Sequence, residues 1–421
     1  MLKLLDFPCD VINLDNGLKV ILYEDNSLPI VAVNIWYKVG SAYETKGKTG
    51  FAHLFEHMMF QGSLNVPKEM HFKYIQEAGG RLNGSTSLDR TNYYETLPAE
   101  SLELALWLES DRMGFLLPAL TQEKLNNQKD VVINERLQNY DNQPYGLAWE
   151  ILFSNLFPED HPYSWPTIGY KKDIEKFELE EVKEFFRNYY APNNASLVIA
   201  GQIDKAQTIE LVKKYFDEIP PNSFSYTPKS INPALSECKS IIHKDNVQLE
   251  KIYLAWHSDV IYGDDDSALD VLSEILTGSK NSKLKRSLIY EKQLVQSVNA
   301  FQFSAVLDGL FIVTATILPE VNPDQVKNII LEELRNLKNT LTNDELLRAK
   351  NSIRSTFIYS LQMIESTADY LNAYNFYTGN PNSFNYDLSR YETVTLEKVI
   401  SVAEKYLTKN FVSLSIIPRD K

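Results

Sequence analysis

The 421-residue sequence contains only two cysteines, Cys9 and Cys238. Two cysteines this far apart do not make a disulfide framework and leave at most one long-range bridge open. The chain also lacks any run of about 20 apolar residues, so we expect no membrane-spanning helix. The first residues, MLKLLDFP, include a charge at Lys3 and no apolar run of signal-peptide length. We therefore expect a cytoplasmic protein, although a periplasmic protein that has lost its signal peptide would look the same.

Positive charge is scarce as well. The chain has 42 Lys and Arg residues against 56 Asp and Glu residues, which gives a formal net charge of −14. Nucleic acids and anionic membranes favour proteins with a basic surface, so this balance argues against both kinds of partner. The content of hydrophobic residues, 44%, is that of a globular protein. A chain of this length exceeds one ordinary core, so we expect two domains or more.

The order of expected elements is repeated along the chain. Residues 179–198 match 396–415 without gaps, and the pair Leu120-Thr121 at the start of one helical run matches Leu341-Thr342 at the start of another. Several matches at nearly one offset indicate a duplicated domain. The elements expected in the first half are a hairpin at 11–23, a β-rich run at 30–39, a helix that carries His53 and His57, extended chain at 82–97 and helices over 100–140 that break at Pro118.

A proline-rich segment separates the two repeats. It lacks sustained periodicity and contains Pro220, Pro221, Pro228 and Pro233. We therefore predict an N-terminal domain at 1–219, a linker at 220–238 and a homologous C-terminal domain at 239–421.

The segment His53-Leu54-Phe55-Glu56-His57 carries the chemical signal. Two histidines four residues apart lie about 40° apart on one helix face, so both imidazoles can bind one metal ion. Glu56 flanks that face and could reach a metal-bound water, and Glu135, in a separate helical run, could supply a carboxylate oxygen. Two nitrogens, one oxygen and an open fourth position are typical of a catalytic zinc site. A glutamate beside the second histidine indicates a zinc peptidase of the inverted kind.

Such a short motif also occurs by chance, and either histidine alone could be a hydrogen-bonded core residue. Longer segments narrow the choice: FAHLFEHMMFQGS at 51–63, EAGGRLNGSTS at 77–87 followed by TNYY at 91–94, VVINER at 131–136 and PNNA at 192–195. Together they resemble the signature of the pitrilysin-type (M16) metallopeptidases over essentially the whole chain. The length resembles the short-chain branch, which includes mitochondrial processing peptidase and many bacterial members.

This resemblance implies an α+β fold with two homologous domains, each a mainly antiparallel sheet flanked by helices. Two such chains would form a clamshell around an enclosed chamber, of which this chain is one half. His53, His57 and Glu135 match the family's zinc ligands, and Glu56 matches the general base. The implied activity is that of an endopeptidase or oligopeptidase, with Zn²⁺ as cofactor, which selects short or unfolded peptides by the size of the chamber.

The resemblance also implies how a peptide binds. The family pairs its substrate with an exposed strand edge, and residues 82–86 match that strand. Asn83 is placed to contact the substrate backbone, with Gly84 and Ser85 beside it, although Asn-Gly is also a common turn pair. Gln128 stands where many members have a second glutamate. It shares a helix face with Glu135 and can hydrogen-bond, but it cannot take a proton.

The second half departs from the pattern of a complete active site. The positions that match the four site residues hold Leu269, Leu272, Ser273 and Thr356. Full-length relatives also carry an arginine and a tyrosine in this half, aimed at the substrate and the oxyanion. Here Ile289 and Gln296 occupy those two positions. We therefore expect the zinc-bearing subunit of a heterodimer whose homologous partner supplies that pair, with a homodimer as the alternative.

Two other classes of function stay open. One is a non-catalytic core subunit, such as the processing-peptidase-like subunits of respiratory complexes. The other is a peptide-binding chamber that keeps zinc only for structure. Loss of a ligand would favour the first, and none of the expected ligands is lost. Cleavage of a peptide that a chelator abolishes would distinguish the zinc peptidase from both.

Overall fold

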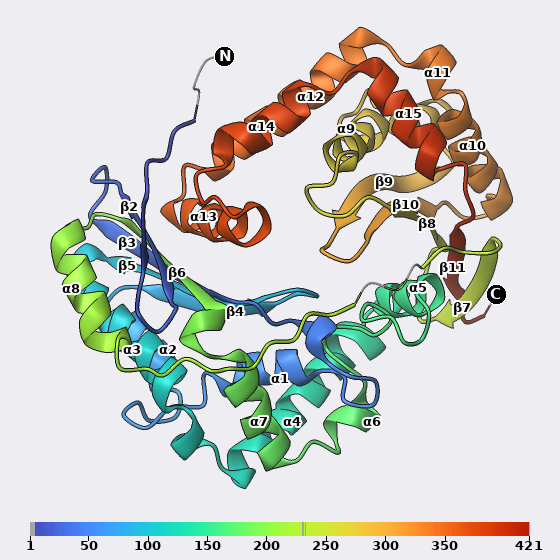
Figure 1. Cartoon of the computed structure of the whole chain (residues 1–421). Coiled ribbons are helices and arrows are strands. Elements are labelled where there is room, and N and C mark those ends of the chain that lie inside the picture. The colour runs from blue at the N-terminus through green and yellow to red at the C-terminus, as the bar shows by residue number, and fades with distance from the viewer. Residues whose placement is uncertain (1–4, 230, 232, 421) are drawn as a thin grey trace. The chain divides into compact units, whose positions relative to one another are not determined.

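Two β-sheets with flanking helices make up the chain (Figure 1). The computed structural model describes residues 5–229, 231 and 233–420. The expectations for the first eight residues and for the linker fall partly on positions outside these described residues. Both cysteines are free, so no disulfide joins them. In the described part of the chain, no helix is both long and apolar enough to cross a membrane.

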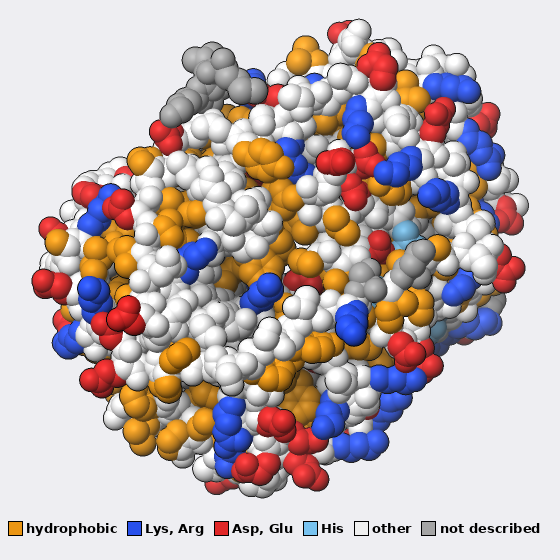
Figure 2. Space-filling view, in the orientation of Figure 1, with side chains coloured by type: hydrophobic (Ala, Val, Ile, Leu, Met, Phe, Trp, Pro, Cys, Tyr) orange, Lys and Arg blue, Asp and Glu red, His pale blue; other side chains and the backbone are white. Residues whose placement is uncertain are grey.

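The chain divides into two compact units, and each unit is made of three segments. Unit 1 comprises Met1–Arg136, Trp165–Pro228 and Ser360–Asn385, and unit 2 comprises Leu137–Ser164, Lys229–Tyr359 and Tyr386–Lys421. On the face shown in Figure 2, acidic and basic side chains are interspersed.

Unit 1 is built on a six-stranded sheet in the order β1-β2-β6-β3-β5-β4. Only β2 and β6 are parallel neighbours. The predicted hairpin is confirmed, because β1 and β2 pair in antiparallel fashion across the turn. The central strand β3 reads IVAVNIWY, a run of β-branched and aromatic residues that suits a strand buried on both faces. The strands are β1 Asp10–Asn13, β2 Lys19–Glu24, β3 Ile30–Tyr37, β4 Arg81–Thr86, β5 Thr91–Pro98 and β6 Ala195–Gly201.

Helices cover both faces of this sheet. The first face contacts α1, α2 and α3, and the second contacts α13. Residues of β5 alternate between them: Tyr93 lies under the Arg112 guanidinium of α3, whereas Asn92 donates to Asp369 of α13. The helices are α1 Phe51–Met58, α2 Met70–Glu77, α3 Leu102–Phe115, α4 Gln122–Arg136, α6 Lys171–Ile174, α7 Leu179–Tyr189, α8 Lys205–Phe216 and α13 Ile364–Thr378.

Unit 2 contains a five-stranded sheet in the order β7-β11-β8-β10-β9. Its core joins the buried apolar residues of β8 and β10 to those of α9 and α15. The strands are β7 Lys239–Asp245, β8 Lys251–Ser258, β9 Val295–Ser304, β10 Gly309–Ile317 and β11 Val412–Pro418. The helices are α5 Ala148–Leu156, α9 Asp266–Thr277, α10 Pro323–Arg335, α11 Leu337–Thr340, α12 Asn343–Ser360, α14 Phe384–Glu392 and α15 Leu396–Tyr406.

The two sheets share one topology. The run β2-β6-β3-β5-β4 in unit 1 has one parallel pair followed by three antiparallel pairs, and β7-β11-β8-β10-β9 in unit 2 has the same sequence of pairings. This agreement confirms the predicted fold class of two homologous α+β parts with mainly antiparallel sheets.

The long helices α4 and α12 begin with the same cap. The Thr121 hydroxyl accepts the backbone N–H of Lys124 at 3.3 Å, and the Thr342 hydroxyl accepts that of Glu345 at 3.3 Å. The Glu345 carboxylate in turn accepts the N–H of Thr342 at 3.0 Å, which completes a capping box. The Leu-Thr pair noted twice in the sequence therefore marks the same structural position in both repeats.

The compact units differ from the contiguous division into 1–219, 220–238 and 239–421. Helix α5, which comes from the first half of the sequence, belongs to unit 2 and contacts β11 and β8. Helix α13, which comes from the second half, belongs to unit 1 and contacts β3 and β6. Each half thus contributes one helix to the other unit, and α13 meets its sheet through polar contacts of Asp369 and Asn372. The bounds 1–219, 220–238 and 239–421 stay a prediction of where the two sequence repeats begin and end.

Candidate metal centre

A buried carboxylate fixes the start of α1. Glu44 is 5% exposed, and its two oxygens accept the backbone N–H groups of Gly50 at 2.9 Å and Ala52 at 2.8 Å. A helix leaves its first N–H groups without intrahelical partners, and the two Glu44 oxygens satisfy two of them. Burial raises the pKa of Glu44 to about 8, and the two N–H donors oppose that rise. The contacts of Glu44 therefore fix the start of α1 independently of its histidines.

Two glycines bring another loop against the same helix start. Gly50 has φ 93° and Gly169 has φ 76°, both in the left-handed region that glycine tolerates. A Cβ on Gly50 would lie 2.7 Å from the carbonyl oxygen of Ile168, and one on Gly169 would lie 2.4 Å from that of Thr49. Any side chain at either position would force these two backbones apart and shift α1.

The structure brings together the three residues predicted as metal ligands. His53 and His57 lie on α1, and Glu135 lies on α4, which packs against α1. The Nε2 atom of His57 is 3.3 Å from Glu135 Oε2, and that of His53 is 3.8 Å from Glu135 Oε1. One ligand atom from each residue lies within 4.8 Å of the other two, and the described residues contain no other such group of three.

These donors fit a zinc ion. Metal–ligand bonds of about 2.0–2.1 Å place tetrahedral ligand atoms roughly 3.3 Å apart, which is the His57–Glu135 spacing and slightly less than the His53–Glu135 spacing. Burial, with the nearby His57 ring, lowers the pKa of His53 to about 4. At neutral pH the His53 imidazole is therefore uncharged, which is the form that binds metal.

Glu56 lies on the same helix and is held by a strand. Its Oε2 accepts a hydrogen bond from the Thr86 hydroxyl at 2.6 Å, and burial raises the pKa of the Glu56 carboxyl. Thr86 is a residue that the sequence reasoning missed. Strand alternation could have found it, since Thr86 is two residues after Gly84 and residues two apart share a face.

Strand β4 lies at the edge of its sheet and divides the predicted substrate residues between two faces. It pairs only with β5 among the described strands, so its outer backbone groups remain open to another strand. Gly84 and Thr86 face α1, and a Cβ on Gly84 would lie 3.2 Å from Glu56 Cγ. Asn83 and Ser85 face the other way, towards α13.

The side chains of the second face are engaged within the sheet. Asn83 Oδ1 accepts the N–H of Gly84 at 2.9 Å, and the Ser85 hydroxyl donates to Asn92 Oδ1 at 2.6 Å. A contact of Asn83 with a substrate backbone stays a prediction. Gln128 is buried on α4, two turns before Glu135 on the same helix face, and its suggested role also stays a prediction.

Comparisons with known proteins identify the family of this chain. The family model described as Insulinase (Peptidase family M16) matches residues 19–164, and the model described as Peptidase M16 inactive domain matches 176–353. The Helicobacter pylori protein named zinc protease PqqE is 31% identical over 86% of this chain and 82% of its own length. This chain belongs to the M16 peptidase family.

Two further similar proteins carry different names. A crystal structure described as a protease from Helicobacter pylori superimposes with a TM-score of 0.91 at 27% identity, and covers 98% of this chain and 100% of that one. The bovine protein named cytochrome b-c1 complex subunit 1, mitochondrial, is 25% identical over 83% of this chain and 74% of its own length.

The second half of this M16 chain has apolar packing where the first half has ligands. Leu269 and Leu272 on α9 are fully buried in the core of unit 2, and the Ser273 hydroxyl donates to the carbonyl of Asp270 in its own helix at 2.8 Å. Ile289 packs against the same core, whereas Gln296 is exposed on β9. Neither supplies the charge or phenol expected at these positions.

Proposed function

We propose that this chain is a zinc-dependent endopeptidase or oligopeptidase that hydrolyses short or unfolded peptides. The observation that carries the proposal is the meeting of His53, His57 and Glu135 beside Glu56 in the family's motif. The name of the Helicobacter pylori relative, zinc protease, supports it. The site residues lie in the part of the chain matched by the insulinase-type model, outside the part matched by the inactive-domain model.

Three of these residues would bind the metal, and Glu56 would transfer the proton. A zinc ion held by His53, His57 and Glu135 would acidify a water and polarise the scissile carbonyl. Glu56 takes the proton of the attacking water and passes it to the leaving amine. Thr86 holds one oxygen of Glu56, which leaves the other oxygen to face the water. The open edge of β4 holds the peptide in extended form through backbone hydrogen bonds.

The direct test uses purified chain, a panel of internally quenched peptides and a chelator. We expect cleavage that the chelator abolishes and that added zinc restores. Cleavage that persists after the metal has been removed would contradict the proposal. Intact folding of the metal-free protein, followed by circular dichroism, is the control that separates loss of chemistry from loss of structure.

A second candidate is a non-catalytic core subunit. The observation that favours it is the 25% identity to a protein named as a subunit of the cytochrome b-c1 complex. A peptide-binding chamber with structural zinc is a variant of this reading. Both predict zinc or peptide binding without cleavage over prolonged incubation, so the same assay distinguishes them from the peptidase.

We further propose that the active form pairs this chain with a homologous subunit across an enclosed chamber. Ile289 and Gln296 offer neither a positive charge nor a phenol to an oxyanion. Donors aimed at such a charge contribute about 2.7–4 kcal/mol each to transition-state stabilisation. Mixing the chain with a homologue that carries the arginine and tyrosine should therefore raise kcat strongly. Equal rates for the isolated chain and the mixture would favour the homodimer.

A further inference from the structure

The residues of the candidate metal centre come from two helices. His53 and His57 move together on α1, whereas Glu135 is carried by α4. Metal–ligand bonds keep their lengths to within about 0.2 Å, so even a small shift of α4 against α1 would weaken the site. The separation of these two helices is therefore the geometric quantity on which metal binding depends.

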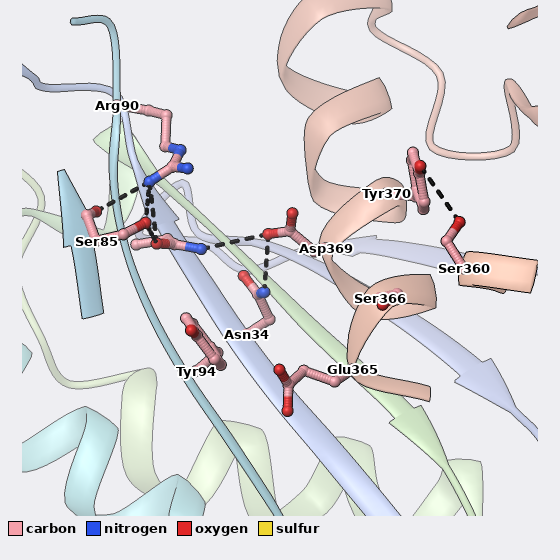
Figure 3. Close-up of a pocket in the computed structure, with 10 residues that line it drawn as sticks. Asn34, Ser85, Arg90, Tyr94, Ser360, Glu365, Ser366, Asp369 and Tyr370 are labelled. Atoms are coloured by element: carbon pink, nitrogen blue, oxygen red, sulfur yellow. Dashed lines mark hydrogen bonds between the residues drawn. The ribbon is translucent and has the colours of Figure 1, made fainter. Parts of the chain in front are cut away.

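The contacts around strand β4 do not set this separation. On the face of the sheet away from Glu56, the Ser85 hydroxyl of β4 donates to Asn92, and the Asn92 amide donates to Asp369 of α13 (Figure 3). These three residues lie on β4, β5 and α13, so they hold the strand behind the proposed base but do not fix α4. The second helix of the metal centre needs a separate support.

The clamp segment, residues 169–177, contacts both helices of the metal centre. It begins at Gly169, includes helix α6 and ends at Phe177, and Figure 1 shows α6 beside α4. Ile174 and Phe177 are 0% and 3% exposed and anchor the segment in unit 1. Because it is anchored, the clamp segment can hold one helix at a fixed distance from the other.

Two cations of α4 bind the clamp segment. The guanidinium of Arg136 donates to the carbonyl of Gly169 at 2.8 Å. The ammonium of Lys129 donates to the carbonyl of Glu175 at 3.0 Å. Residues seven apart lie on the same face of a helix, so these contacts hold α4 over two turns. Glu135 lies about 100° around the helix from Arg136, which directs it at α1 while the other face meets the clamp segment.

Arg136 is the stronger of these two contacts. It is 7% exposed, and its guanidinium lies 5.9 Å from the centroid of the Tyr170 ring, whereas the bond of Lys129 is exposed to solvent. A hydrogen bond from a charged donor is stronger when its partners are shielded from water. Arg136 also directly follows Glu135 in the sequence, so its release frees the turn that carries the ligand.

The same segment holds the residues at the start of α1. The Thr49 hydroxyl donates to Asp173 Oδ2 at 2.8 Å and accepts the backbone N–H of Tyr170 at 3.0 Å. Thr49 and Asp173 are 1% and 3% exposed, so their bond is shielded from water. The ring of Phe177 packs on that of Phe51, the first residue of α1, with centroids 3.9 Å apart. The clamp segment therefore holds the start of α1 as well as the end of α4.

We propose that the clamp segment sets the separation of α1 and α4, and that Arg136 and Thr49 are the positioning residues through which it acts. The inference rests on the proposed zinc peptidase function and adds to it residues that determine zinc affinity without touching the ion. The Nε2 atom of His57 and the Oε2 atom of Glu135, 3.3 Å apart, already have a separation that suits a tetrahedral ion. Release of either end of the clamp should therefore weaken zinc binding.

The test is a double-mutant cycle on zinc affinity, measured on the whole chain by competition with a chromophoric chelator. Arg136→Met keeps the length of the side chain but removes every donor, and Thr49→Val replaces the hydroxyl with a methyl group. We expect each variant to lose about 10–100-fold in zinc affinity, the range found for groups that support metal ligands. Because both variants break one clamp, the double variant should lose little more than the weaker-binding single variant.

Two further variants separate positioning from general stability. Arg136→Lys retains a donor on a long stem and should recover part of the affinity, and it takes the place of Arg136→Met in the cycle if that variant does not fold. Arg390→Met removes a guanidinium of unit 2 that donates to Asp266 at 2.8 Å. It should lower Tm but leave zinc affinity unchanged.

Cobalt substitution reports the geometry of the site itself. The visible absorption of bound Co²⁺ depends on the number and the arrangement of its ligands. Arg136→Met and Thr49→Val should both change this spectrum, and in the same direction, because each releases α4 from α1. Arg390→Met should leave the spectrum unaltered, since a loss of stability in unit 2 does not move a ligand.

The outcomes also distinguish this inference from the proposed function, because zinc binding requires no cleavage. Weaker zinc binding in both single variants, with losses that do not add in the double variant, would support the clamp even if the unaltered chain cleaves no peptide. Unchanged affinity in either single variant, or losses that add fully, would overturn it. Cleavage of quenched peptides by the unaltered chain reports on the peptidase function alone.

Discussion

Helix α1 of unit 1 and helix α9 of unit 2 occupy the same place in two sheets of the same strand order, but their contents differ. In unit 1 the helix presents His53, Glu56 and His57, and a neighbouring helix supplies Glu135. In unit 2 two of the four matching residues, Leu269 and Leu272, are buried leucines that join the core. One scaffold can therefore carry either a polar centre or an apolar core, and the choice depends on a handful of side chains.

The polar centre of unit 1 requires additional contacts that hold it in place. Glu44 is buried to fix the start of α1, and the Nδ1 atom of His53 is buried without a hydrogen-bond partner among the described residues. Buried polar groups cost free energy unless they are paired, so the unpaired His53 Nδ1 lowers stability at a place where the buried leucines of α9 add to it. Substitutions in the two units should therefore have different effects.

The largest effect should follow the loss of the proposed base. Glu56→Gln is nearly isosteric but cannot accept a proton, so we expect kcat to fall about 10²–10⁴-fold while zinc content and Tm are unchanged. A control in unit 2 is Glu274→Gln, which changes a glutamate of α9 that does not stand at the position of Glu56 and should leave kcat unaltered. Normal turnover by Glu56→Gln would remove the assigned role from that residue.

The second largest effect should come from removing a core leucine of unit 2, compared with removing the histidine that stands at the same place in unit 1. Leu269 is fully buried, and Leu269→Ala should lower the free energy of unfolding by about 2–5 kcal/mol. His53→Ala in metal-free protein should cost clearly less and should abolish zinc binding, which Leu269→Ala preserves. Chemical denaturation of both variants with and without zinc provides the measurement. Equal losses of unfolding free energy in the two variants would contradict the assignment of Leu269 to the core and of His53 to the metal site.

Acid should destabilise unit 1 through its buried histidines. Burial, together with the Arg112 charge, lowers the pKa of His71 to about 3. Below the ordinary pKa of about 6.5, the unfolded chain binds a proton that folded His71 refuses, so stability is complete above pH 6.5 and falls towards pH 3 by about 1.4 kcal/mol per pH unit.

The control for this pH effect is His71→Gln, which retains a side-chain donor but does not titrate. His53, whose pKa burial lowers to about 4, should maintain a smaller slope in the metal-free variant. Denaturation midpoints measured between pH 7 and pH 4 would reveal the difference. Parallel curves for the variant and the unaltered chain would show that His71 is not responsible.

The smallest effect concerns the strand that holds the base. Thr86→Val removes the hydrogen bond to Glu56 with little change in shape, so kcat should fall a few-fold to about tenfold, with KM and zinc content unchanged. Thr86→Ser should recover most of the rate. The matched control, Thr316→Val, breaks a hydroxyl pair with Ser297 in unit 2 and should not affect kcat. A change confined to KM would instead assign Thr86 to substrate binding.

Local patterns in the sequence were sufficient for much of this comparison. The Asp-Asn-Gly turn predicts the β1–β2 hairpin, the two Leu-Thr pairs predict the starts of α4 and α12, and four-residue spacing places both histidines on one face of α1. These features depend on neighbours within a few residues, and such neighbours can be seen in a sequence.

Contacts between segments that are far apart along the chain could not be predicted from the sequence. Nothing near Ala148–Leu156 or Ile364–Thr378 shows that each helix packs in the unit built mainly from the other half. The role of Glu44 at the start of α1, and the contact of Thr86 with Glu56, likewise depend on long-range packing that local periodicity does not encode.

The central claim, that unit 1 alone carries one metal centre, is tested most directly by zinc content. We expect one zinc ion per chain in the unaltered protein after dialysis, and a marked loss of zinc in Glu135→Gln, which replaces a carboxylate ligand with a weaker amide. Both proteins should unfold cooperatively when metal-free, which excludes misfolding as the cause. Full zinc occupancy in Glu135→Gln, or none in the unaltered chain, would contradict the account.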